Sequence, residues 1–263
     1  MADLLVAEGL ALALPDFSRR PLLGAAPRVA ILRGVSFALG RGEVLGIVGG
    51  SGSGKTTLGR CLLRLLEPTG GRVVFDGVDV THLPEPALGP FRRRAGMVFQ
   101  DPLSALNPRH TVRRLLLGPV RLHGLPEARA AEALDMVGLP EALMDRYPHE
   151  ISGGQRQRVG IARAVALRPD FLLCDEVVSG LDLSSQAQVL NLLGGLAREL
   201  GLALAFISHD LGVVRHLCLR VLVLEGGVVA EEGAVAELFE RPRSQATRAL
   251  LDAIALPDPD QAW

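Results

Sequence analysis

Lysine is almost absent from this chain of 263 residues. Its 28 basic residues comprise 27 arginines and a single lysine, Lys55. The formal net charge is −1, so the chain lacks the overall basic character that draws proteins onto nucleic acid, and we expect no nucleic-acid partner. Short basic runs such as Arg92–Arg94 are interpreted first as a solvated surface.

Cysteines are few, and long apolar runs are missing. Cys61, Cys174 and Cys218 form no CxxC or Cys/His spacing, which argues against a cysteine metal centre and favours a reducing compartment. No run approaches the roughly 18 apolar residues that cross a bilayer. Asp3 and Glu8 stand where a signal peptide would be positively charged. We therefore expect a cytosolic protein that works at a membrane only by docking to another component.

Strand-like and helix-like segments alternate on both sides of a mostly helical stretch, about 101–168. Residues 185–200 are typical of an amphipathic helix. This order predicts an α/β core with a largely parallel, buried sheet and a helical insert. The strand-like segments are 3–14, two runs within 35–50 around a Gly40–Gly42 turn, 95–100, 171–176 and 202–208, and two hairpins, 71–80 and 221–231.

A glycine-rich segment, GGSGSGKTT, connects a strand-like run to a helix-like run and fits the phosphate-binding pattern G-x-x-x-x-G-K-[ST]. Its glycines let backbone N–H groups turn toward a phosphate, and a helix beginning near Lys55 adds partial positive charge. The Thr56 hydroxyl is placed to bind Mg²⁺. The candidate nucleotide-binding residues are Gly49, Gly50, Ser51, Gly52, Ser53, Gly54, Lys55, Thr56 and Thr57.

The only lysine of the chain falls inside this loop. A cradle of backbone amides leaves a narrow gap near the β- and γ-phosphates. A compact ammonium fits such a gap, whereas a planar guanidinium is wider and needs a fork-shaped partner. A chain that uses arginine everywhere else but keeps Lys55 is consistent with a site that rejects arginine on geometry.

The segment FLLCDE, residues 171–176, is a buried-type strand that ends in two carboxylates. Asp175 is suited to hold Mg²⁺ through water, and Glu176 to orient or polarise an attacking water molecule. An acidic strand end is common by itself, but the phosphate-binding loop earlier in the chain favours the catalytic interpretation.

A second anion-binding arrangement lies between these segments. ISGGQ, residues 151–155, places a serine and two glycines before a helical run. Because one nucleotide does not need two separate cradles in one chain, we expect this one to serve a nucleotide bound to another subunit. Its residues are Ser152, Gly153, Gly154 and Gln155.

In this order the segments resemble the ATP-binding subunits of ABC transporters over nearly the whole chain. The family's Q-loop glutamine corresponds to Gln100 in VFQDP, its D-loop to SGLD at 179–182, and its switch histidine to His209 in FISHD. The resemblance implies ATP and Mg²⁺ as ligands. It implies Glu176, His209 and Gln100 as catalytic residues, and Thr56, Gln100 and Asp175 around the metal.

The resemblance also implies a P-loop NTPase (RecA-like) core with an N-terminal antiparallel β subdomain and a helical subdomain insert. The core and β subdomain would occupy about 1–100 and 169–232, the insert about 101–168, and a helical tail 233–263. An aromatic residue that stacks on adenine is expected near the N-terminus. Phe17 is the candidate, and an ordinary loop residue is the alternative.

Longer phrases, among them DPLSALNPRHTV and SSQAQVLNLL, look like the oligopeptide, dipeptide and nickel importers of that family. This branch implies peptide uptake, with nickel or another small solute as the alternative. It implies a homologous ATPase partner, identical or different, two membrane-spanning permease subunits and, indirectly, a solute-binding protein, at the cytoplasmic face of the inner membrane. A soluble ABC protein of DNA repair or translation fits less well, because such proteins usually carry two cassettes or long coiled insertions.

The chain departs from the family pattern at three positions. Val177 stands where Pro usually follows the glutamate, Gly180 replaces Ala in the D-loop, and Ile151 replaces Leu before the serine. None of these changes removes a catalytic group, so the resemblance still implies ATP hydrolysis.

Overall fold

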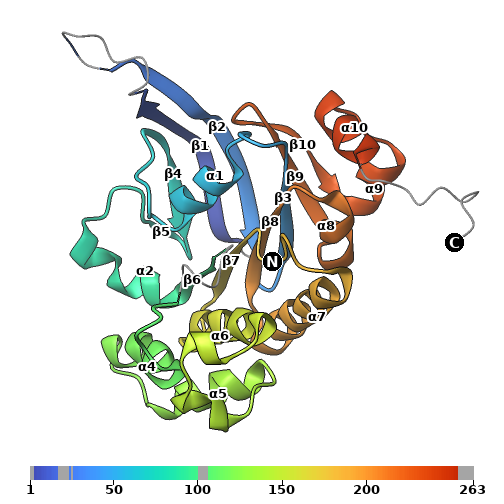
Figure 1. The fold of residues 1–263 in the computed structure, drawn as a ribbon. Helices are drawn as coiled ribbons and strands as arrows, with labels where there is room; N and C mark the ends of the chain where they lie inside the picture. Colours follow the sequence, from blue (N-terminus) through green and yellow to red (C-terminus); the bar gives the residue numbers. More distant parts are fainter. Residues whose placement is uncertain (1–2, 17–23, 25, 100–105, 254–263) are drawn as a thin grey trace, which may run out of the picture.

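The computed structural model describes residues 3–16, 24, 26–99 and 106–253. It confirms an α/β fold with two sheets (Figure 1). The first sheet has the strand order β2-β1-β4-β5, and all its neighbouring strands are antiparallel. Its strands are β1 (Asp3–Pro15), β2 (Arg28–Gly40), β4 (Gly70–Phe75) and β5 (Val78–Asp79).

The second sheet has six strands in the order β10-β9-β3-β8-β7-β6 and is parallel except for the β9–β10 pair. Every residue of β7 and β8 is buried, as expected of a parallel sheet covered on both faces. Its strands are β3 (Val44–Val48), β6 (Ala95–Val98), β7 (Phe171–Asp175), β8 (Ala203–Ser208), β9 (Arg220–Glu225) and β10 (Val228–Ala234).

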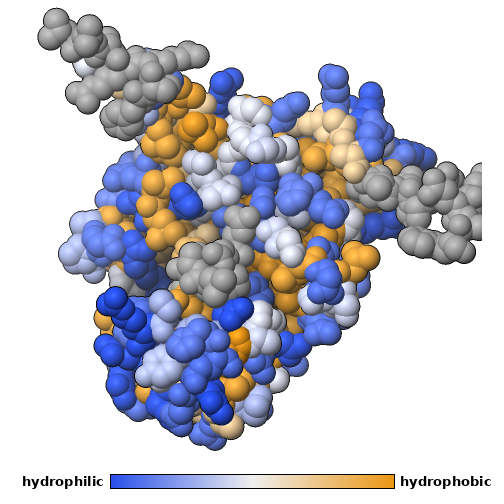
Figure 2. Space-filling model, in the orientation of Figure 1, coloured by the Kyte–Doolittle hydropathy of each residue, from blue (hydrophilic) through white to orange (hydrophobic). Residues whose placement is uncertain are grey.

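In the described part of the chain, α-helices and three short 3₁₀ turns surround these sheets, and α4, α5 and α6 gather in a separate helical lobe at the bottom of Figure 1. The face of this lobe seen in Figure 2 is mostly hydrophilic. Within the described residues, no helix has the length and apolar content to cross a bilayer. The helices are α1 (Lys55–Leu62), α2 (Gly89–Arg94), α4 (Val112–Leu122), α5 (Ala128–Met136), α6 (Gly153–Val165), α7 (Leu183–Leu200), α8 (Leu211–Leu217), α9 (Val235–Glu240) and α10 (Gln245–Asp252), and the turns are Glu85–Leu88, Glu141–Asp145 and Pro148–Glu150.

The register of the parallel strands places their carboxyl ends at one edge of the sheet. Val48, the last residue of β3, lies opposite Ser208, the last residue of β8. Asp175, the last residue of β7, lies opposite Ile207. The residues that follow these three strands therefore emerge side by side, which is where open α/β sheets bind their ligands.

Helix α1 ends at Leu62, although Leu58, Leu62 and Leu65 follow one another at helical spacing in the sequence and predict a longer helix. Leu58 and Leu62 are buried, but the helix ends at Leu62, and Leu65 is 47% exposed. Arg64 adopts a left-handed backbone conformation with φ of 53°, which ends a helix. Its buried guanidinium then donates from Nε to the Val80 carbonyl at 2.8 Å, fixing the chain in this turn.

Two other features differ from a simple interpretation of the pattern. The strand-like runs on either side of the Gly40–Gly42 turn belong to different sheets, β2 to the antiparallel one and β3 to the parallel one. Helix α8 was not expected, although Asp210 before it is a typical N-cap. The Asp210 carboxylate accepts hydrogen bonds from the Gly212 and Val213 N–H groups.

The close packing of α1 on the sheet gives a stability prediction. A Cβ on Gly59 would lie 2.7 Å from Leu173 Cδ2, whereas one on Gly195 in α7 would meet no atom within 4 Å. We expect Gly59→Ala to destabilise the protein by about 1–3 kcal/mol through overpacking. Gly195→Ala should be neutral or stabilising by up to about 1 kcal/mol, the gain in helix propensity. Urea unfolding of both variants tests the contrast, and equal shifts would contradict the packing.

Candidate functional site

The loop from Gly49 to Gly54 leaves strand β3 and enters helix α1 in a form that only glycine permits. A Cβ on Gly49 would lie 2.3 Å from the carbonyl oxygen of Leu224. Gly54 has a φ of 100° and is the N-cap of α1 without a side-chain cap. The first N–H groups of α1 are therefore not bonded by a capping side chain and remain able to bind an anion.

The Lys55 side chain folds back into this loop. Its Nζ donates to the carbonyl oxygens of Gly49 at 2.8 Å and Gly50 at 2.9 Å, and the residue is only 6% exposed. Burial lowers the pKa of Lys55, and the nearby carboxylates of Glu176 and Asp175 partly oppose this shift. An anion bound in the loop would favour the charged ammonium.

Thr56 and Asp175 meet across the site. The Thr56 hydroxyl donates to Asp175 Oδ1 at 3.1 Å, although the two residues are 119 positions apart in the sequence. Burial raises the pKa of Asp175, and the hydrogen bond from Thr56 lowers it. The pair presents a hydroxyl and a carboxylate oxygen side by side, a donor set that suits Mg²⁺.

Glu176 and His209 form the second polar pair of the site. His209 Nδ1 lies 3.6 Å from Glu176 Oε2. The Glu176 backbone has a φ of 48°, an uncommon conformation for this residue type, and its N–H donates to the Ile207 carbonyl at 3.0 Å. His209 follows β8 directly, and the hydroxyl of Ser208 accepts a hydrogen bond from the Asp210 N–H.

A cavity of about 350 Å³ brings the phosphate-binding loop and Glu176 together. It is lined by Ile31, Ser51, Gly52, Gly54, Lys55, Thr56, Thr57 and Glu176. Ile31, from strand β2, was not predicted, because a single apolar residue in a strand carries no signal in the sequence. Among the other predicted residues, Phe17 and Gln100 lie outside the described residues.

The second predicted cradle lies at the start of α6 and does not line this cavity. Ser152 Oγ accepts a hydrogen bond from the Gln155 N–H at 3.2 Å, and Gln155 Oε1 accepts one from the Ser152 N–H at 2.9 Å. This reciprocal pair is a capping box, which fixes the first turn of the helix. Ser152, Gly153 and Gly154 are exposed there, so a ligand on another molecule can reach them.

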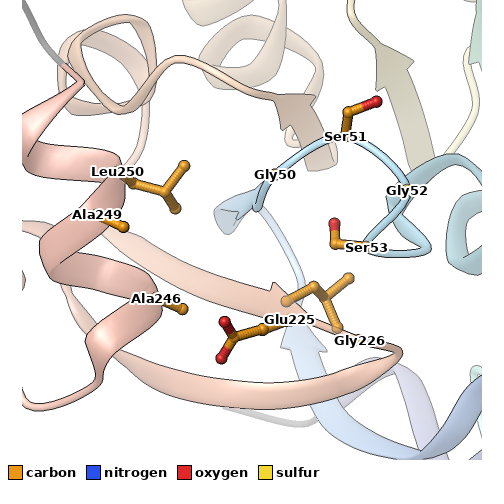
Figure 3. Close-up of a pocket in the computed structure, with 10 residues that line it drawn as sticks. Gly50, Ser51, Gly52, Ser53, Glu225, Gly226, Ala246, Ala249 and Leu250 are labelled. Carbon is orange, nitrogen blue, oxygen red and sulfur yellow. The ribbon is translucent and has the colours of Figure 1, made fainter.

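A second cavity, of about 520 Å³, shares Ser51 and Gly52 with the first (Figure 3). Ala246, Ala249 and Leu250 of helix α10 face the loop across it. This cavity is mostly apolar and its lining does not include Lys55, Thr56 or Glu176, so the smaller cavity is the one that holds these predicted site residues.

The sequence of this chain is similar to those of known proteins. A profile of the ABC transporter family matches residues 32–179. The chain belongs to the ABC transporter family. A Brucella ovis protein, named provisionally as a peptide import ATP-binding protein, is 52% identical over 235 residues, 88% of this chain and 74% of that protein. The oligopeptide transport ATP-binding protein AppF of Bacillus subtilis is 47% identical over 232 residues, 86% and 70% of the two chains.

Solved structures of ABC cassettes agree with this membership. The dimeric MJ0796 cassette in a post-hydrolysis state with ADP and Pi has a TM-score of 0.76 at 29% identity, covering 88% of this chain and 98% of its own. The cbiO1 protein of Clostridium perfringens has a TM-score of 0.78 at 30% identity, covering 92% of each chain. The chain is thus an ABC cassette that binds and hydrolyses ATP.

The single lysine allows a direct test of the loop. Lys55 and the N-terminus carry the only aliphatic amines of the chain. An ordinary lysine has a pKa near 10.4. Because the pKa of Lys55 is lowered, its neutral, reactive amine should be present at a lower pH than that of an ordinary lysine. We expect ATP to slow reductive methylation of Lys55, because phosphate oxygens favour the unreactive ammonium.

The measurement is mass spectrometry after trypsin digestion, since a methylated Lys55 is poorly cleaved. The N-terminal amine is the internal control and should react equally with and without ATP. Equal rates at Lys55 in the two conditions would contradict nucleotide binding at this loop.

Proposed function

We propose that this chain is the ATP-hydrolysing subunit of an ABC importer that takes up peptides across the cytoplasmic membrane. The observation that carries the proposal is the cavity in which the loop, Lys55, Thr56 and Glu176 converge. The names of the relatives, which refer to peptide or oligopeptide transport, favour peptides over nickel as the transported solute.

In this function the backbone N–H groups of Gly49–Thr57 and the Lys55 ammonium bind the phosphates. Thr56 and Asp175 would hold Mg²⁺, which supplies positive charge to the phosphate oxygens when bound. Their side-chain oxygens, 3.1 Å apart, support this role. Gln100, which lies outside the described residues, stays a predicted third metal contact.

Glu176 acts on the water that attacks the phosphate. Its carboxylate lines the cavity of the loop, so it can accept a proton or a hydrogen bond from a water placed there. His209, 3.6 Å from that carboxylate, is positioned to contact the same region and to hold Glu176 in place. Gln100 as a sensor of the phosphate and Phe17 as the adenine contact remain predictions from the sequence.

The start of α6 serves the nucleotide of a second ATPase subunit. Ser152, Gly153 and Gly154 are exposed and lie outside the chain's own cavity, which supports a role across a subunit interface. The dimeric state of a related cassette supports the same arrangement. Two permease subunits and, indirectly, a solute-binding protein complete the importer, with this chain at the cytoplasmic face of the membrane.

Two variants separate phosphate binding from hydrolysis. Lys55→Ala should lose both ATP binding and hydrolysis, because the ammonium is removed from the loop. Glu176→Gln should still bind ATP but hydrolyse it about 10²- to 10⁴-fold more slowly, the usual contribution of a general base. Glu199→Gln, on the exposed side of α7, is the matched control and should keep wild-type activity. Wild-type turnover in Glu176→Gln would refute the assignment of Glu176.

The transported solute is tested in the cell that carries the chain. A strain with Glu176→Gln in place of the wild-type copy should lose uptake of a labelled oligopeptide, because the importer is no longer energised. Uptake of Ni²⁺ in the same strain should be unchanged. Loss of Ni²⁺ uptake with normal peptide uptake would contradict the proposed substrate class.

A further inference from the structure

Helix α6 contacts the turn that follows the catalytic strand β7. The side chain of Gln157, in the second turn of α6, is 3% exposed. Its Nε2 donates to the carbonyl oxygen of Val177 at 2.7 Å. Val177 comes directly after Glu176 and is itself buried. One buried hydrogen bond therefore joins the helical lobe to the residue next to the proposed catalytic carboxylate.

The turn after β7 needs such support because its backbone is strained. Glu176 has a φ of 48°, a conformation that persists only where surrounding contacts hold it. The Ser179 hydroxyl and N–H both donate to the Glu176 carbonyl, at 2.9 and 3.1 Å. These bonds lie within the turn and close it locally. The bond from Gln157 comes from a different part of the chain and fixes the turn relative to α6.

The residue at position 177 makes this outside bond more important. A proline there would fix φ near −65° and stiffen the turn from within. Val177 leaves that dihedral to be set by its surroundings. In this chain the hydrogen bond from Gln157 holds the carbonyl end of Val177, a residue whose own φ is not fixed by a ring.

Gln157 lies close to the exposed start of α6, so its hydrogen bond can transmit a movement of that end of the helix. Gln157 lies four residues, about one helical turn, beyond Gly153 in the exposed start of the same helix. A helix moves as a rigid rod over such a short distance. A displacement of the Ser152–Gly154 end therefore reaches the Val177 carbonyl through one side chain.

We propose that Gln157 is a positioning residue that couples the start of α6 to Glu176. This inference rests on the proposed function, in which the start of α6 contacts the partner's nucleotide and Glu176 acts on the chain's own. Closure over one nucleotide then sets the turn, and with it the carboxylate, at the other.

The first test replaces the donor and keeps the volume. Gln157→Met should lower kcat about 10- to 100-fold, the range expected when a catalytic group is misplaced by about 1 Å. The KM for ATP should stay within about twofold of wild type, because the phosphate-binding loop is untouched. Gln188→Met is the matched control, since Gln188 lies on the exposed side of α7 and accepts a bond from Arg158 of α6 at 3.3 Å, so this variant also loses one hydrogen bond to α6. A kcat for Gln157→Met within twofold of wild type would overturn the proposal.

A second variant separates positioning from a general packing role. Adding Val177→Pro to Gln157→Met stiffens the turn without the hydrogen bond, and should recover kcat several-fold relative to Gln157→Met alone. If Gln157 only fills space in the core, the proline cannot restore activity, and the absence of recovery overturns the proposal. Thermal unfolding with and without ATP checks that every variant is folded and binds nucleotide.

A double-mutant cycle tests the coupling to the start of α6. Ser152→Ala should lower kcat less in the Gln157→Met background than in the wild type, because the path from α6 to Glu176 is already broken. If kcat of the double variant falls by the product of the two single-variant factors, the coupling is overturned. If Glu176→Gln hydrolyses ATP as fast as the wild-type chain, the proposed function is overturned as well. Dependence on Glu176 with no effect of Gln157→Met overturns this inference alone.

Discussion

The site depends on the parallel register of strands β3, β8 and β7. Val48 pairs with Ser208, and Ile207 pairs with Asp175, so the three strands end within one residue of each other. The phosphate-binding loop, His209 and Glu176 are simply the next residues along each strand. A slip of one residue in a sheet turns every side chain of the strand to the opposite face. All residues of β7 and β8 are buried, so every side chain packs against neighbours on one face of the sheet or the other, and a slip would disrupt this packing.

This edge of the sheet supplies only part of the groups that the sequence assigns to nucleotide binding. A second, smaller set lies at the start of α6, where a capping box shapes an exposed helix end. In the proposed function these two regions of one chain have separate tasks, because the loop binds the chain's own phosphates and the start of α6 contacts the partner's nucleotide. The hydrogen bond from Gln157 to Val177 is a direct physical link between these two regions. A conformational signal between two nucleotides would need a contiguous contact of this kind.

The spacing of residue types along the chain predicted the phosphate-binding loop, the carboxylates of Asp175 and Glu176, and the alternation of strands and helices. Each of these features depends on residues that are neighbours in the sequence. The same local information could not place Ile31 in the cavity or Gln157 against Val177, since these contacts join segments that the fold alone brings together. The end of α1 could not be predicted from the sequence for another reason. Arg64 takes a left-handed conformation to reach the Val80 carbonyl, and tertiary contact overrides the leucine periodicity. Phe17, Gln100 and the subdomain boundaries stay predictions.

The contrast between lysine and arginine in this chain follows from how many acceptors converge at each position. Arg220 directs its three guanidinium nitrogens to Glu43, Glu232 and the Ala38 carbonyl, so each nitrogen of its planar fork has an acceptor. At Lys55 two acceptors converge, the carbonyls of Gly49 and Gly50, and the residue is almost completely buried. A guanidinium there would leave several of its five donors buried without partners, which costs free energy. The ammonium has three donors that can exchange carbonyl oxygens for phosphate oxygens without a fixed plane, so this geometry favours lysine over arginine at position 55.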